Sequence, residues 1–205
     1  MSIWAIVVAA GSGDRFGGPK QYEQLGALRV LDWSLDTARD ACDGIVLVVH
    51  PERAGDPEPG ADAVVSGGLT RSASVRAGLA AVPPDAEVIL VHDAARPRGS
   101  RELWRRVIDE VHLGADAVVP AVAVVDTLRE VGGGTVDRER FVAVQTPQGF
   151  RADVLRRAHV AEPEGTDDAS LVDAAGGIVR VVDGEPDNRK ITTPYDLAAM
   201  RACVR

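Results

Sequence analysis

The stretch that decides the fold is "IWAIVVAAGSGDRFGGPK" at residues 3–20. Its first half is a short run of Ile, Val and Ala, which predicts a buried strand at 3–9. Its second half places four glycines within residues 11–18 and ends on Lys20. Glycine lets a backbone approach a ligand closely, and the N–H groups of such a turn can surround an anion. The stretch therefore predicts an α/β protein with an anion-binding loop after its first strand.

Two common phosphate-binding motifs do not match this loop. The dinucleotide fingerprint G-x-G-x-x-G requires glycine at position 16, where the chain has Phe16. The P-loop G-x-x-x-x-G-K-[ST] requires lysine directly after Gly18, but Pro19 intervenes and Gln21 stands where the Mg²⁺-binding hydroxyl would be. What remains is a long glycine-rich turn that carries Arg15 and Lys20. Two solvated cations on a surface turn are the alternative interpretation.

The rest of the chain alternates short β-branched runs with segments of helical period, which is typical of an α/β domain with a mostly parallel sheet. Further strands are predicted at 44–50, 87–92, 116–122 and 177–183. Helices are predicted at 30–41, 70–82, 101–113, 151–160, 167–175 and 194–203. The last helix has Thr193 as its N-cap and Pro194 at its first position. No linker or repeat divides the chain, so one domain over residues 1–205 is expected.

One segment interrupts this alternation. "AVVDTLREV" at 123–131, three glycines at 132–134 and "TVDRERFVAVQ" at 135–145 predict a β-hairpin over residues 122–146. Its many charged residues indicate that it is not all core. Such an arm either lies on its own domain or reaches a second subunit.

The composition excludes several classes of function. A formal net charge of −8 over 205 residues disfavours non-specific binding to nucleic acid or anionic membranes. Cys42 and Cys203 lack the spacing of a zinc site and do not indicate a disulfide framework, so a reducing cytoplasm is expected. The N-terminal apolar run has no basic region before it and is too short to cross a bilayer, so export is not expected.

Lysine is rare in this chain. Of 23 basic residues, only Lys20 and Lys190 are lysine, which leaves 21 arginines. Lysine is a compact point charge and arginine a planar fork, so a site that needs the first cannot simply take the second. Both lysines lie in loops with other candidate residues.

The glycine-rich segment "AAGSGDRFGGPKQY" at 9–22 resembles the nucleotide-binding signature of the cytidylyltransferases that act on polyol phosphates. The resemblance continues through nearly the whole chain, in "SGGLTRSASVRAGL" (66–79), "VHDAARP" (91–97), "VDTLREV" (125–131), "TVDRERF" (135–141), "QTPQGF" (145–150), "TDDASLVDAAG" (166–176) and "DNRKITTPYDL" (187–197). It implies a single Rossmann-like nucleotidyltransferase domain with an inserted β-hairpin arm. The activity it implies is transfer of CMP from CTP to a polyol phosphate. "HDAARP" favours 2-C-methyl-D-erythritol 4-phosphate, with ribitol 5-phosphate as the alternative acceptor.

The resemblance also implies roles for single residues. The resemblance implies catalytic roles for Arg15, Lys20, Arg138 and Lys190. Nucleotide binding falls on Ala10, Gly11, Ser12, Gly13, Gly68, Ser74 and Asp93. Binding of the polyol phosphate falls on Arg96, Thr127, Arg138, Thr146 and Lys190. Leu69 departs from the family, where a polar residue is expected, so the selectivity for the base stays open.

A Mg²⁺ ion, or another divalent cation, is expected at Asp93 and Asp187, with phosphate oxygens and water completing its shell. A purely structural role for Asp187 is an equally good interpretation. The resemblance further implies a homodimer in which each site takes Thr127 and Arg138 from the arm of the other subunit; the alternative for Arg138 is a solvated hairpin charge. His92 is expected to be structural, because an ionised phosphate nucleophile needs no base. A nucleotide-binding regulator without turnover is the alternative from another class.

Overall fold

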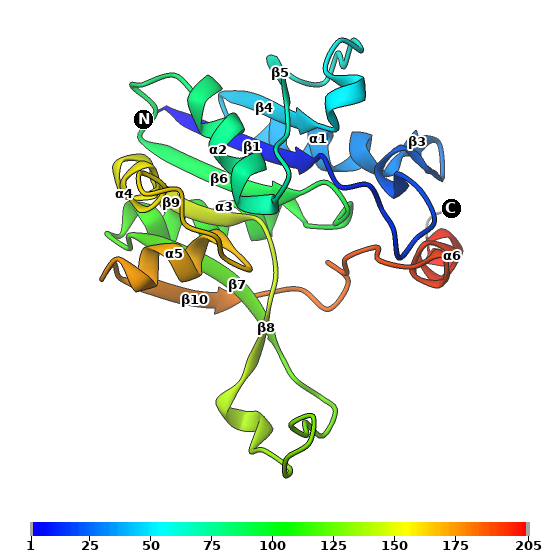
Figure 1. Ribbon diagram of the computed structural model, residues 1–205, viewed down its shortest axis with the longest axis vertical. Coiled ribbons are helices and arrows are strands. Elements are labelled where there is room, and N and C mark those ends of the chain that lie inside the picture. Colours follow the sequence, from blue (N-terminus) through cyan, green and yellow to red (C-terminus); the bar gives the residue numbers. More distant parts are fainter. Residues whose placement is uncertain (1, 204–205) are drawn as a thin grey trace.

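The centre of the protein is a twisted eight-stranded sheet, in a computed structural model that describes residues 2–203 (Figure 1). The main strand order is β10-β7-β9-β6-β1-β4-β5, and β8 pairs with the end of β7. The strands are β1 (Ile3–Ala9), β4 (Gly44–Val49), β5 (Ala63–Ser66), β6 (Val88–Asp93), β7 (Ala117–Ala123), β8 (Val142–Val144), β9 (Gln148–Arg151) and β10 (Val179–Asp183).

Most of the sheet is parallel, as predicted. β1 pairs in parallel with β4 and β6, β4 with β5, and β7 with β10. β9 runs antiparallel between β6 and β7. β5 and β9 were not predicted from the sequence. β9 reads "QGFR", without a β-branched residue, and its Gly149 lies so close to α3 that an added Cβ would come 2.5 Å from Val107. Its place in the sheet is set by packing rather than by β-propensity.

The helices cover both faces of the sheet. They are α1 (Val30–Ala41), α2 (Arg71–Ala81), α3 (Arg101–His112), α4 (Ala152–Ala158), α5 (Asp168–Ala174) and α6 (Pro194–Cys203), each within three residues of its predicted bounds. Side chains of β1 alternate between the two faces: Ala5 and Val7 pack in a core with α1 and α3, whereas Ile6 packs in a core with α2, α4 and α5. The result is a three-layer α/β/α arrangement.

A third apolar cluster joins the two ends of the chain. Leu25 in the short hairpin β2 (Gln24–Leu25) and β3 (Leu28–Arg29) packs with Val30, Ile191, Leu197 and Met200. The predicted start of α6 is confirmed, since the amide of Asp196 donates to Thr193 Oγ1 at 3.3 Å. This packing brings the loop before α6 beside the glycine-rich loop after β1. No helix within residues 2–203 is long and apolar enough to cross a membrane.

The segment between β7 and β8 forms an arm that projects away from the sheet (Figure 1). The antiparallel pairing at its base runs only from Ala121↔Val144 to Ala123↔Val142, and an isolated bridge joins Arg129 to Thr135 around the glycine turn. Between these pairings the chain is irregular and holds a 3-10 turn at Arg138–Arg140. The segment predicted as a β-hairpin over 122–146 therefore has antiparallel pairing at its base and around its glycine turn and is irregular between them, because few of its side chains have a core to pack against.

Candidate active site

A cavity of about 530 Å³ opens where β1, β4, β5 and β6 end. Open parallel sheets bind ligands at this carboxyl edge of their strands. Its lining comes from five loops: Val8, Ala9, Ala10, Gly11, Ser12, Lys20, Gln21, His50, Pro51, Gly67, Gly68, Leu69, Thr70, Arg71, Ser74, Asp93, Ala94, Ala95 and Lys190. Eight of the predicted site residues are among them: Ala10, Gly11, Ser12, Lys20, Gly68, Ser74, Asp93 and Lys190.

The glycine-rich turn is held by its own backbone. The carbonyl of Gly13 accepts the amides of Phe16, Gly17 and Gly18 at 2.8, 2.9 and 3.2 Å. Gly13 has φ +77°, and an added Cβ would lie 1.8 Å from the carbonyl oxygen of Gly18, so only glycine fits. Gln21 ties the turn to β1 by donating to the carbonyls of Ala9 and Gly11. Gly11 and Ser12 thus lie at the cavity wall.

Lys20 and Lys190 meet at this cavity from opposite ends of the chain. Burial lowers the pKa of Lys20, and the nearby charges of Lys190 and Arg15 lower it further. Burial disfavours the charged ammonium most, and each neighbouring cation disfavours it further. A polyanion in the cavity would relieve the repulsion.

Asp93, the last residue of β6, is the acidic centre of this cluster. Its carboxylate accepts from Lys190 Nζ at 2.7 Å and lies 3.6 Å from Arg71 Nε. Burial alone would raise the pKa of Asp93, but the charges of Lys190 and Arg71 outweigh burial and hold that pKa well below its usual range. Asp93 is therefore ionised throughout the physiological range.

The opposite wall is the turn between β5 and α2. Ser74 Oγ accepts the amide of Gly68 at 3.2 Å and donates to the carbonyl of Thr70 at 2.9 Å. An added Cβ at Gly67 would lie 2.4 Å from Ala10, so this turn packs directly against the chain leaving β1. Thr70 caps α2 by accepting the amide of Ala73. The wall is small, rigid and rich in backbone groups, which suits recognition of a flat base edge.

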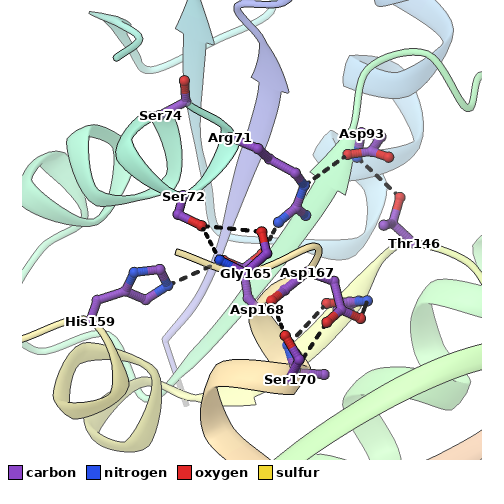
Figure 2. A network of polar contacts seen from close by, with 12 residues as sticks. Arg71, Ser72, Ser74, Asp93, Thr146, His159, Gly165, Asp167, Asp168 and Ser170 are labelled. Atoms are coloured by element: carbon purple, nitrogen blue, oxygen red, sulfur yellow. Dashed lines mark hydrogen bonds and ion pairs between the residues drawn. The ribbon is translucent and has the colours of Figure 1, made fainter. Parts of the chain in front are cut away.

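Sequence reasoning missed Arg71, the first residue of α2. Arg71 lines the cavity, and its guanidinium bridges Asp93 to the fully buried Asp168 of α5, to which Nη1 donates at 2.7 Å (Figure 2). The pKa of Arg71 is raised because Asp168 and Asp93 together outweigh its burial. The available signal was its position directly after the helix cap in "GGLTRS", within a segment already singled out.

Several predicted residues support the cavity without lining it. Thr146 is buried; its Oγ1 accepts the amide of Asp93 at 3.0 Å and lies 3.1 Å from His92 Nδ1. Burial lowers the pKa of His92 to about 4, which leaves the ring neutral, in line with the structural role expected for it. Arg96 donates to the carbonyl of Asn188 at 2.8 Å, with Nε 3.9 Å from Asp93 Oδ2. Arg15 is exposed, and its charge reaches Lys20.

The structure does not bring three other predicted residues to the cavity. Thr127 and Arg138 are exposed on the arm, where Arg138 Nη1 donates to the carbonyl of Val125. Asp187 is also exposed and forms an ion pair with Arg98 at 3.6 Å. None of the three lines the cavity within one chain. The roles of Thr127 and Arg138 in a second subunit and the metal role of Asp187 stay predictions.

The described residues contain no cluster of three or more His, Cys, Asp or Glu side chains that could hold a metal by themselves. A Mg²⁺ ion bound through one or two carboxylates and substrate phosphates does not require such a cluster. Asp93 is a hard oxygen donor at the cavity wall, so the donor set fits a metal that arrives with a phosphate ligand.

A cationic cavity around one carboxylate, at the carboxyl edge of a parallel sheet, defines an α/β nucleotide-binding protein. The comparisons with known proteins narrow this class. The family model described as "IspD: 2-C-methyl-D-erythritol 4-phosphate cytidylyltransferase" matches residues 3–205, and the chain belongs to this family.

Relatives and solved structures agree with this assignment. A 2-C-methyl-D-erythritol 4-phosphate cytidylyltransferase of Rhodococcus jostii (strain RHA1) is 44% identical over 98% of this chain and 95% of its own length. The crystal structure of the protein of that name from Thermus thermophilus is 38% identical, covers all of both chains and superposes with a TM-score of 0.87. The bifunctional IspDF of Campylobacter jejuni is 28% identical with a TM-score of 0.86, over 97% of this chain and 54% of its own length.

Proposed function

We propose that this protein transfers the cytidylyl group of CTP to 2-C-methyl-D-erythritol 4-phosphate and releases pyrophosphate. A phosphate oxygen of the acceptor forms a bond to the α-phosphorus, and the bond between that phosphorus and the α,β-bridging oxygen breaks, with its electron pair leaving on pyrophosphate. Membership of the family supports this reaction. The observation that carries the proposal is that the only two lysines of the sequence line one cavity with Asp93.

The work of catalysis is mainly electrostatic. The acceptor phosphate is already ionised near neutral pH, since its second pKa is about 6, so no side chain must remove a proton. Negative charge increases on the oxygens around the α-phosphorus in the transition state, and preorganised cations stabilise it. Lys20, whose pKa is lowered by burial and by its cationic neighbours, is placed for this task. The backbone amides of residues 11–12 add fixed donors.

Asp93 and Lys190 form an ion pair that contacts with a substrate can replace. Lys190 Nζ donates to Asp93 Oδ2 at 2.7 Å, and the lysine side chain is 39% exposed. An incoming phosphate group offers Lys190 an alternative anion, and Asp93 is then free to hold a divalent cation with the phosphate oxygens. When bound, Mg²⁺ would neutralise phosphate charge and orient the leaving pyrophosphate. We propose this metal dependence together with the reaction.

The turn between β5 and α2 is the proposed cytosine pocket. Gly68 and Ser74 present fixed backbone and hydroxyl groups, and a tight wall of this kind excludes purines by size. The Leu69 side chain cannot hydrogen-bond to the nucleotide, so selectivity for the base is assigned to the backbone and to Ser74.

We further propose that two chains form a homodimer through the arm. Its apolar side chains are exposed in the single chain, with Val125 at 78% and Val131 at 107% of full exposure. Thr127 and Arg138 lie on the same arm and away from their own cavity. Pairing with a second copy would cover the apolar side chains and deliver these two polar groups to the acceptor site.

Pyrophosphate release measured with CTP and each acceptor in turn tests the reaction. 2-C-methyl-D-erythritol 4-phosphate should support turnover at a kcat/KM at least about 100-fold above that with ribitol 5-phosphate. Equal rates with both acceptors would reject the stated acceptor, and pyrophosphate release from neither would reject the reaction. Repeating the assay with EDTA, and then with added Mg²⁺, tests the metal. Light scattering of the full chain tests the dimer.

A further inference from the structure

Arg71 stands between two carboxylates, only one of which borders the cavity. Asp93 lines the cavity and lies 3.6 Å from Arg71 Nε, whereas Asp168 is fully buried behind it and accepts from Nη1 at 2.7 Å (Figure 2). The Arg71 side chain keeps 23% of its surface exposed. Asp168 therefore holds the side chain of Arg71, which lines the cavity, although Asp168 itself is too deeply buried to contact a ligand there.

The far side of Asp168 is held as well. His159, the residue directly after α4, has Nε2 3.1 Å from Asp168 Oδ1, and both side chains are buried (Figure 2). An ionised carboxylate only accepts hydrogen bonds, so Nε2 is the donor. Each oxygen of Asp168 thus has its own partner, which leaves the carboxylate little freedom to rotate. A chain of contacts runs from His159 to Asp168, on to Arg71 and finally to Asp93. It connects the buried residues beside α4 and α5 to the cavity.

We infer that Asp168, held by His159, is a positioning residue for CTP binding, because it fixes the Arg71 guanidinium at the cavity wall. The inference rests on the proposed function, since it takes CTP as the ligand of this cavity. Asp168 does not touch the ligand and acts only through Arg71.

The contact with Asp168 matters because Arg71 has a second carboxylate, Asp93, within reach. Asp93 is already within 3.6 Å of Arg71 Nε, and arginine readily forms two parallel hydrogen bonds to one carboxylate. Without the negative charge at Asp168, Arg71 would move onto Asp93 and compete with Lys190, which now contacts the same carboxylate at 2.7 Å. The cavity would lose a cation directed at the ligand, and Asp93 would be blocked.

Asp168→Asn tests the inference, because asparagine keeps the size of the side chain and removes its charge. Glu110→Gln is the control: Glu110 of α3 pairs at 3.1 Å with Arg180 of β10, and neither residue lines the cavity. Titration calorimetry with CTP should give a Kd at least about 10-fold weaker for Asp168→Asn and unchanged for Glu110→Gln. The KM for CTP should rise by the same factor while kcat changes by less than about threefold.

These readouts separate positioning from loss of folded protein. A variant that is partly unfolded binds fewer equivalents of CTP and shows a lower apparent kcat, but its folded fraction keeps the normal Kd and KM. In an Arg71→Met background, Asp168→Asn should weaken CTP binding no further, because its effect passes through Arg71. A further loss there would show that Asp168 acts by another route and would overturn the inference.

A second variant keeps the test decisive if Asp168→Asn does not fold. His159→Leu removes the donor to Asp168 Oδ1 and leaves the pair with Arg71, so the CTP Kd should weaken about threefold. A CTP Kd that is unchanged in whichever variant folds would overturn the inference while the proposed function stands. If the wild-type protein itself does not bind CTP, the proposed function fails first.

Discussion

The cavity and the arm are built in opposite ways. The cavity is lined by residues from five loops, anchored to a core in which β1, β4 and β6 have fully buried side chains. The arm between β7 and β8 is mostly exposed and is held by three paired positions at its base and one bridge near its tip. In the cavity Asp93 has cationic partners in the same chain, Lys190 and Arg71. On the arm Arg138 donates to a neighbouring backbone carbonyl.

This contrast indicates which parts of the site one chain can complete alone. Buried charges must be paired within the fold, because an unpaired charge in a low-dielectric interior is costly. Exposed groups carry no such requirement and can await a ligand or a second subunit. The cavity around Asp93 is therefore preorganised in one chain, whereas we propose that the acceptor side depends on the arm.

Lys20→Ala should produce the largest effect on activity. Removal of a cation that meets the growing charge of the transition state should lower kcat by about 100-fold or more, with a much smaller rise in KM for CTP. Steady-state pyrophosphate release measures both constants. Arg157→Ala removes an exposed arginine outside the cavity lining and serves as the control. A change confined to KM would assign Lys20 to ground-state binding alone.

Gly13→Ala should damage the nucleotide side without removing any charge. A methyl group there would meet the Gly18 carbonyl, and the positive φ would be strained by about 1–3 kcal/mol, so kcat/KM should fall about 10-fold or more. Gly55→Ala is the control, since an added Cβ there meets nothing within 4 Å. Wild-type kinetics for Gly13→Ala would mean that the turn has no part in binding.

Mixed dimers test whether the arm acts across the subunit boundary. Lys20→Ala and Arg138→Ala should each be nearly inactive, but equal amounts mixed under exchange should recover about a quarter of wild-type activity. Random pairing makes half of the dimers mixed, and each mixed dimer has one intact site. If mixed dimers form, as shown by differently tagged chains, and no activity returns, the arm serves its own cavity.

The smallest expected effect concerns the loop that carries Lys190. Asp196 Oδ2 accepts the amides of Thr192 and Thr193 at 2.9 and 2.7 Å. Burial would raise the pKa of Asp196, but these hydrogen bonds outweigh it and lower that pKa. A folded-state pKa below the unfolded one stabilises the protein above the unfolded value of about 4, and the benefit disappears as the pH falls through the folded value.

Asp196→Asn should therefore lower Tm by about 2–4 °C at pH 7, and the difference from wild type should shrink below pH ~4. Thermal unfolding followed by circular dichroism over this range measures it. Asp173→Asn, at an exposed position on α5, is the control. A difference in Tm that is independent of pH would show that the charge of Asp196 does not contribute.

Much of the architecture could be predicted because it depends on local patterns. The apolar run before the glycines predicted β1, and the Thr193–Pro194 signal predicted the start of α6. β5 and β9 escaped prediction because they are only four residues long and lack a clear period. The paired part of the predicted hairpin is short for a related reason, since strand propensity needs packing partners to be realised.

The gathering of eight predicted residues around one cavity could also be predicted, because they occur in short motifs. Glycines in a turn and lysines in an arginine-rich chain mark an anion site by residue type alone. Asp168 carries no such mark, because aspartate at the start of a helix is normally explained by capping and by the helix dipole. Only its burial and its contact with Arg71 reveal a further role.

By itself the sequence determined the class of fold, the glycine-rich loop after β1 and the charged residues of the cavity. Only the tertiary structure decided that Lys190 contacts Asp93, and that Arg71 contacts Asp168, each across 97 positions of the chain. The physical reason is the range of the forces involved. Backbone propensities and periodicity act over a few neighbouring residues, whereas the pairing of buried charges is settled only when strands and helices from distant segments pack into one core.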